Sequence, residues 1–153
     1  MRHKFLSAFA ALILVLGFSI QVAAETSAED SFKYRKYIMK ALSGHAGAIS
    51  MQARGLAGNP DYVAKHAKAI AGLGSELHAL FAEGSNVEDS ETLPVVWEEP
   101  EEFAAAIAAA EEATAALGEV ADSGDMKVIG AAFRNVGKAC KGCHDRFREE
   151  HDD

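Results

Sequence analysis

The stretch Cys140-Lys141-Gly142-Cys143-His144 lies near the C-terminus, at the end of the most regular apolar pattern in the chain. From about Asp125 to Glu150, apolar residues recur in alternating steps of three and four, which is the spacing of a helix in a left-handed bundle. The pattern consists of Met126, Ile129, Phe133, Val136, Cys140, Cys143 and Phe147. Because both cysteines continue this seam, the sequence predicts that they lie on the buried face of the helix.

The spacing Cys-x-x-Cys-His is typical of covalent haem c attachment. Each thiol can form a thioether with a haem vinyl group, and the imidazole of His144 can bind the iron as proximal ligand. Other uses of the two cysteines fit less well. A disulfide would close a very small loop, a thioredoxin-like site requires strands that the pattern does not indicate, and a zinc site requires a second ligand pair. The sequence therefore predicts one covalent haem c, held by Cys140, Cys143 and His144.

The N-terminus has the features of a secretory signal peptide. A basic start is followed by an apolar, uncharged run from Phe5 to Ile20 and by the small residues Val22-Ala23-Ala24, with a cleavage site expected before Glu25. The alternative is a transmembrane anchor, for which the apolar run is short. We assign residues 1–24 to the signal peptide and residues 25–153 to one domain, and expect a periplasmic protein with no membrane insertion after cleavage.

The charge of the chain limits its partners. The signal segment holds two of the 15 basic side chains and none of the 23 acidic ones, so the remainder carries a formal charge of −10. Such a balance argues against nucleic acid or an anionic membrane as a partner and suits a partner with basic patches. Lys141, Arg146 and Arg148 are expected around the haem edge, either as a local positive spot for docking or as a solvated helix face.

Three further helices precede the one that carries the cysteines. The first is expected from about Ala28 to Arg54, the second from Asn59-Pro60 to about Phe81, and the third from Glu99-Pro100 to about Ala121. A long connection over residues 84–100 joins the second to the third. The inward-facing residues are expected to be Phe32, Arg35, Met39, Leu42, Ala46, Ile49 and Ala53, then Val63, His66, Ile70, Leu73, Leu77 and Leu80, then Phe103, Ile107, Ala110, Thr114, Leu117 and Ala121. The predicted fold is all-α, an antiparallel four-helix bundle with covalently attached haem c.

The chain resembles the class II cytochromes c, the group of cytochrome c′ and cytochrome c-556. The resemblance rests on Tyr34-Arg35 and Met39-Lys40 in the first helix, on Leu93-Pro94 with Trp97 in the connection, and on the segment from Cys140 to Arg148. It implies a haem buried in the bundle, with Met39 over the distal haem face. It also implies that Arg35 lies near the haem edge, where its guanidinium could pair with a propionate.

Other histidines offer weaker candidates for a haem ligand. His45 lies off the seam and is expected to be half-buried with a hydrogen-bond partner. His66 is on the second stripe, where a core histidine with a partner is the simpler interpretation. His78 and His151 are expected at the surface.

Met39 divides the functional hypotheses. If its thioether binds the iron, the haem is six-coordinate and suits a one-electron carrier that serves an unidentified periplasmic redox partner. If Met39 only shields the face, as a core methionine does, the iron is five-coordinate and open to NO or CO. The sequence favours the first hypothesis, and the protein is not expected to be an enzyme. The small outer residues of the first two helices, such as Ala48 and Ala57, permit a homodimer.

Overall fold

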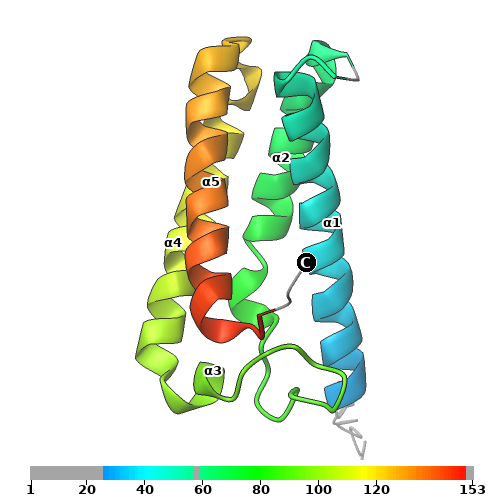
Figure 1. The fold of residues 1–153 in the computed structure, drawn as a ribbon, viewed down its shortest axis with the longest axis vertical. Helices are drawn as coiled ribbons and strands as arrows, with labels where there is room; N and C mark the ends of the chain where they lie inside the picture. The colour runs from blue at the N-terminus through cyan, green and yellow to red at the C-terminus, as the bar shows by residue number, and fades with distance from the viewer. Residues whose placement is uncertain (1–25, 57–58, 151–153) are drawn as a thin grey trace, which may run out of the picture.

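Four long helices form an antiparallel bundle in the computed structural model, which describes residues 26–56 and 59–150 (Figure 1). The long helices are α1 (Ala28–Ala53), α2 (Val63–Gly74), α4 (Pro100–Val120) and α5 (Met126–Phe147). The short ones are η1 (Pro60–Tyr62), η2 (Leu77–Ala79), α3 (Val95–Glu98) and η3 (Ala121–Ser123). The predicted fold class is therefore confirmed, while the predicted signal peptide falls outside the described residues.

Polar side chains fix the starts of α1 and α5. The Ser27 hydroxyl accepts a hydrogen bond from the backbone N–H of Asp30, 3.0 Å away. The Asp125 carboxylate accepts from the N–H groups of Lys127 and Val128. These bonds satisfy N–H groups that have no partner within the helix. At the other end of α1, Gly55 adopts a positive φ of 67°, as the residue that ends a helix often does.

The second helix is shorter than predicted. It ends at Gly74, and the chain continues through a turn into η2. The Ser75 hydroxyl donates to the carbonyl of Gly72, which adds a side-chain bond where the helix stops. Leu77 and Leu80 are still buried, as expected from the stripe, because η2 continues along the bundle. The apolar pattern thus predicted burial correctly and the length of the helix incorrectly.

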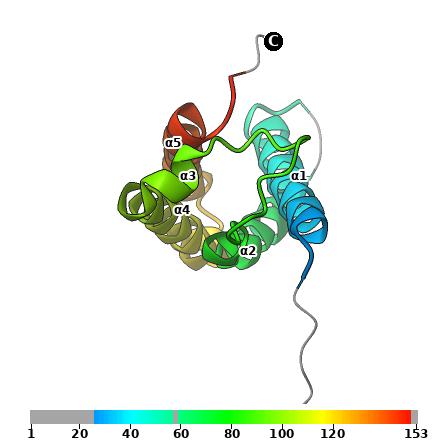
Figure 2. The same ribbon diagram turned by 90° about the horizontal axis from the view of Figure 1, so that it is seen from below.

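The long helices pack in sequence around the bundle. α1 packs on α2, α2 on α4, and α4 on α5, whereas α1 and α5 approach each other less closely. Seen from below, the connection after η2 crosses the base of the bundle between α1 and α5 (Figure 2). The bundle is therefore loosest along the edge where the cysteine-bearing helix faces the helix that carries Met39.

The buried apolar residues form two clusters. The upper cluster contains Ile49, Val63, Ala67, Ile70, Leu117, Ala121, Ile129 and Val136. The lower cluster contains Ile38, Leu77, Leu80, Ile107 and Ala110. Met126, predicted to face inward, is instead 38% exposed, because it is the first residue of α5 and lies above the upper cluster.

The connection is fastened to the end of α5. The N–H of Leu93 donates to the carbonyl of Phe147 at 3.0 Å, and the N–H of Glu149 donates to the carbonyl of Glu91 at 2.8 Å. These bonds flank an antiparallel bridge between Thr92 and Arg148, so α5 ends at Phe147 rather than near Glu150. The connection also contains the one-turn helix α3, which the sequence did not predict.

Candidate functional site

The two cysteines lie where the seam predicts. Both are half-buried, and neither forms a disulfide. Cys140 packs against the upper cluster and Cys143 against the lower one, so the motif lies at the junction of the two halves of the core. A group attached to both thiols would therefore lie against apolar side chains on the inner side of α5.

Burial governs the ionisation of the motif. Burial, followed by the neighbouring Cys140, raises the pKa of the Cys143 thiol to about 11. Burial also raises the pKa of the Cys140 thiol. Burial, followed by the charge of Arg148, lowers the pKa of His144. The imidazole is therefore kept neutral, which is the form that binds a metal ion.

Met39 reaches the same region from the opposite helix. It is half-buried and packs against the lower cluster, as Cys143 does. Leu42 lies one turn further along α1 and packs against both clusters. The structure thus brings Met39 and Cys143 to one apolar cluster from the two helices whose mutual packing is loosest.

Arg35 is the most buried charged side chain among the described residues, with 4% of its surface exposed. Its Nη1 donates to the carbonyl of Leu80 at 3.1 Å and to the Ser85 hydroxyl at 2.8 Å. Its Nη2 donates to the carbonyl of Ser85 at 3.0 Å and to the Ser90 hydroxyl at 3.2 Å. Burial lowers the pKa of Arg35 from its ordinary value. The guanidinium therefore ties α1 to the connection, and its pairing with a haem propionate stays a prediction.

Sequence reasoning missed Ser85 and Ser90 as partners of Arg35. They are 50 and 55 residues from Arg35 along the chain, and no local spacing links them to it. The only signal was that a buried arginine requires acceptors and that the long connection supplies hydroxyls and free carbonyls.

Aromatic rings fill the base of the site. Phe103 of α4 makes edge-on contacts with Phe81 and with Phe147, with ring centroids 4.7 and 5.1 Å apart. The guanidinium of Arg35 lies 5.1 Å from the centre of the Phe81 ring. This row of rings links the segment after η2 to the end of α5, and edge-on packing of this kind adds to the stability of a core.

The basic residues near the motif are compensated by acids. Lys141 pairs with Asp145 at 2.6 Å. Arg146 pairs with Glu99 and Glu102, and Arg148 lies 3.9 Å from Glu91. These exposed pairs favour the interpretation of a solvated helix face over that of a positive docking spot.

The other histidines within residues 26–56 and 59–150 lie away from the motif. His45 and His66 are half-buried and bond to each other, with 2.8 Å between their Nδ1 atoms. This confirms the expected hydrogen-bond partner of each. His78 is exposed and contacts Glu111, as a surface histidine would. His151 falls outside the described residues.

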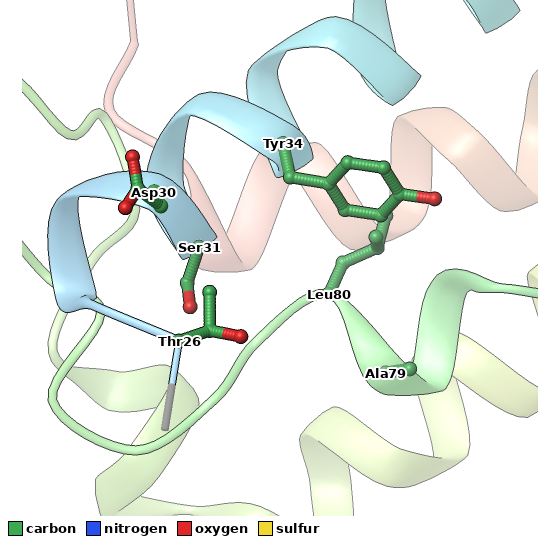
Figure 3. Close-up of a pocket in the computed structure, with 6 residues that line it drawn as sticks. All are labelled: Thr26, Asp30, Ser31, Tyr34, Ala79 and Leu80. Atoms are coloured by element: carbon green, nitrogen blue, oxygen red, sulfur yellow. The ribbon is translucent and has the colours of Figure 1, made fainter. Parts of the chain in front are cut away.

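A pocket lies elsewhere, between the start of α1 and η2 (Figure 3). Its lining residues are Thr26, Asp30, Ser31, Tyr34, Ala79 and Leu80. None of them belongs to the cysteine motif, so this pocket is not the haem site. It is bordered by the hydrogen bond from the Tyr34 hydroxyl to Glu76, which raises the pKa of Tyr34.

The residues present fit a covalent haem. Two half-buried thiols at the attachment spacing, an adjacent imidazole whose pKa is lowered, and apolar clusters on the inner side of α5 match what haem c requires. Within residues 26–56 and 59–150, no group of three or more histidine, cysteine, aspartate or glutamate side chains is arranged to hold a metal ion by itself. In the same ranges, no helix has the length and hydrophobicity to cross a membrane.

Comparison with known proteins also supports a covalent haem. The family model described as Cytochrome C′ matches residues 30–148. A cytochrome c′ of Pararhodospirillum photometricum is 38% identical over 80% of this chain and 99% of its own length. A cytochrome c-554 of Cereibacter sphaeroides is 32% identical over 90% of this chain and 95% of its own length.

Solved structures share the whole bundle. The cytochrome c′ of Rubrivivax gelatinosus matches with a TM-score of 0.76 and 28% identity, over 81% of this chain and 98% of that one. A ferrous variant of Alcaligenes xylosoxidans cytochrome c′ with bound NO matches with a TM-score of 0.74 and 26% identity, over 82% and 98%. A CO-bound variant of the same protein matches with a TM-score of 0.73, 27% identity and the same coverage.

Proposed function

The chain belongs to the cytochrome c′ family, and from this premise we propose that it binds a diatomic gas, NO or CO, at its haem. Members of the family carry one covalently attached haem c, and this chain has the attachment motif in the expected position on its last helix. The observation that carries the proposal is the match, over almost the full length of the neighbour, to structures that hold NO and CO.

The residues of α5 would hold the cofactor. Cys140 and Cys143 would form the two thioethers, and His144 would bind the iron on the proximal side, where its lowered pKa favours the neutral imidazole. When bound, haem supplies an iron that can take up a diatomic gas or exchange one electron. The apolar clusters on the inner side of α5 would favour a weakly polar ligand, such as a diatomic gas, over a charged one.

Met39 would shield the distal face in this proposal. Its side chain packs against the lower cluster, so it already has an apolar environment that does not depend on an iron bond. Because the methionine side chain is flexible, it can rotate away from a small ligand at a modest cost in free energy. The five-coordinate alternative considered from the sequence thereby becomes the preferred function.

The second candidate is the one-electron carrier, with Met39 as sixth ligand. This candidate is supported by the packing of Met39 and Cys143 against the same cluster. One relative of this chain is named cytochrome c-554 and not cytochrome c′. The redox partner of such a carrier is unidentified, and its periplasmic location and a homodimer through the first two helices stay predictions.

The spin state of the purified holoprotein separates the two candidates. We expect a high-spin ferric spectrum and rapid CO binding by the reduced protein. A low-spin ferric spectrum with a thioether–iron band at its red end, and no CO binding, would overturn the proposal in favour of the carrier.

Substitution of Met39 gives a second measurement. The Met39→Ala variant is expected to keep a high-spin spectrum and to bind CO at least as fast as the wild type, because the distal face becomes more open. Met51→Leu, at an exposed methionine of the same helix, is the matched control and is expected to change neither property. Conversion of a low-spin wild type to high spin by Met39→Ala alone would identify Met39 as a ligand.

A further inference from the structure

Two histidines face each other between α1 and α2, outside the haem site. The Nδ1 atoms of His45 and His66 are 2.8 Å apart, and the two rings are tilted by 50° with centroids 5.1 Å apart. Both side chains are half-buried, so packing holds the rings while one side of the pair stays accessible to water. The proposed function uses neither residue.

This pair differs from two other side-chain hydrogen bonds that join α1 to the segments flanking α2. The Tyr34 hydroxyl donates to the Glu76 carboxylate, and the Gln52 amide donates to the carbonyl of Asn59. Each of those links joins a group that only donates here to an oxygen that only accepts. The histidine link instead joins two nitrogens that are both metal-ligating atoms in their neutral form.

The separation of the two nitrogens suits a tetragonal metal ion. With metal–nitrogen bonds of about 2.0 Å, two imidazoles at 90° around one ion have their nitrogens about 2.8 Å apart, whereas a tetrahedral angle requires about 3.3 Å. The observed separation matches the first value. Tetragonal geometry with nitrogen ligands is typical of Cu(II) and Ni(II), and copper binds such ligands more tightly.

We propose that His45 and His66 bind one Cu(II) ion through their Nδ1 atoms and thereby bridge α1 and α2. In the metal-free pair, one Nδ1–H donates to the other Nδ1. On binding, that proton moves to Nε2 of the same ring through solvent, so both Nδ1 lone pairs become available and no net proton is released. Each ring turns so that its lone pair leaves the line between the two nitrogens and points at the ion.

The rest of the coordination comes from water. The described residues place no third histidine, cysteine or carboxylate beside the pair, and the accessible side of the pair leaves room for water ligands. The formal charge of −8 favours the approach of a cation over long range. Because the protein supplies only two ligands, the preference for Cu(II) over other metal ions comes from the separation of the two nitrogens and not from a complete shell of protein ligands.

The test uses the ferric holoprotein and Cu(II) chloride as the probe. Equilibrium dialysis is expected to give one bound copper per chain, and the electron paramagnetic resonance of that copper is expected to show coupling to two nitrogens. Removal of an outer-shell partner of a metal ligand already costs 10–100-fold in affinity. His45→Ala and His66→Ala should therefore each lower the affinity at least tenfold.

Two further variants keep the result interpretable. His78→Ala removes an exposed histidine that contacts Glu111 and is expected to leave copper binding unchanged. His66→Gln preserves hydrogen bonding with little metal affinity, and should lose copper while keeping the far-ultraviolet circular dichroism and haem spectrum of the wild type. Absence of stoichiometric binding by the wild type, coupling to a single nitrogen, or wild-type copper affinity in the His45→Ala and His66→Ala variants would each overturn the proposal.

Discussion

Gly74 of α2 lies tightly against Thr114 of α4, and Gly74→Ala tests that contact. A Cβ at Gly74 would lie 2.2 Å from Oγ1, 2.6 Å from Cβ and 3.0 Å from Cγ2 of Thr114. Ordinary van der Waals contact begins at 3.4 Å. Thr114 is 2% exposed and lies on α4, so it has no solvent into which it could turn. The added methyl group can be accommodated only if the two helices move apart.

The expected cost follows from two opposing effects. Overpacking of a core by one methyl group costs about 1–3 kcal/mol, and overlaps as deep as these indicate the upper end of that range. Alanine is the better helix former by about 1 kcal/mol. The free energy of unfolding of the Gly74→Ala holoprotein should therefore fall by about 2 kcal/mol.

Urea unfolding of the holoprotein, followed by far-ultraviolet circular dichroism, measures this loss. Gly72→Ala is the matched control, because a Cβ at Gly72 has no atom within 4 Å. That variant gains helix propensity alone and should be more stable by up to about 1 kcal/mol. If Gly74→Ala is as stable as Gly72→Ala, the close approach of α2 and α4 is refuted.

Two further substitutions probe the fold around the site. Arg35→Met should lower the free energy of unfolding of the holoprotein by about 3–5 kcal/mol, because it leaves buried acceptors at Ser85 without a donor. Lys33→Ala, at an exposed ion pair of the same helix, should change it by less than about 0.5 kcal/mol, and similar losses in the two variants would contradict the role of Arg35. Asp125→Ala should cost about 1 kcal/mol in thermal or urea unfolding because it removes the N-cap of α5, whereas Asp125→Asn should retain most of that stability.

Much of the fold followed from local signals. Ala28 and Pro100 start α1 and α4 as predicted, because capping residues and proline act within one turn of the chain. The stripe from Ile107 to Ala121 proved buried, since a period of about 3.6 determines which residues share a helix face. The early end of α2 at Gly74 was not predicted. One continuous helix would bury Leu77 and Leu80, and so does a shorter helix followed by a turn and η2, so the apolar pattern does not distinguish the two.

The site was predictable in part for the same reason. Cys140, Cys143 and His144 form a motif within five residues, and their place on the seam follows from neighbours one turn away. Arg35 was recognised as a buried charge that requires partners, but Ser85 and Ser90 could not be identified as those partners. Their approach depends on how the connection folds over the base of the bundle, which no periodicity encodes.

The sequence by itself indicated the chemistry of this protein, namely where haem would be attached, which imidazole would accompany it, and which face of the last helix is buried. Only the tertiary structure decided which residues of other helices meet that face. Met39 and Cys143 share one apolar cluster, and His45 meets His66, because α1 takes a particular register against its neighbours. Register is set by the summed packing of many side chains that are distant in sequence, so it emerges only when the whole bundle is assembled.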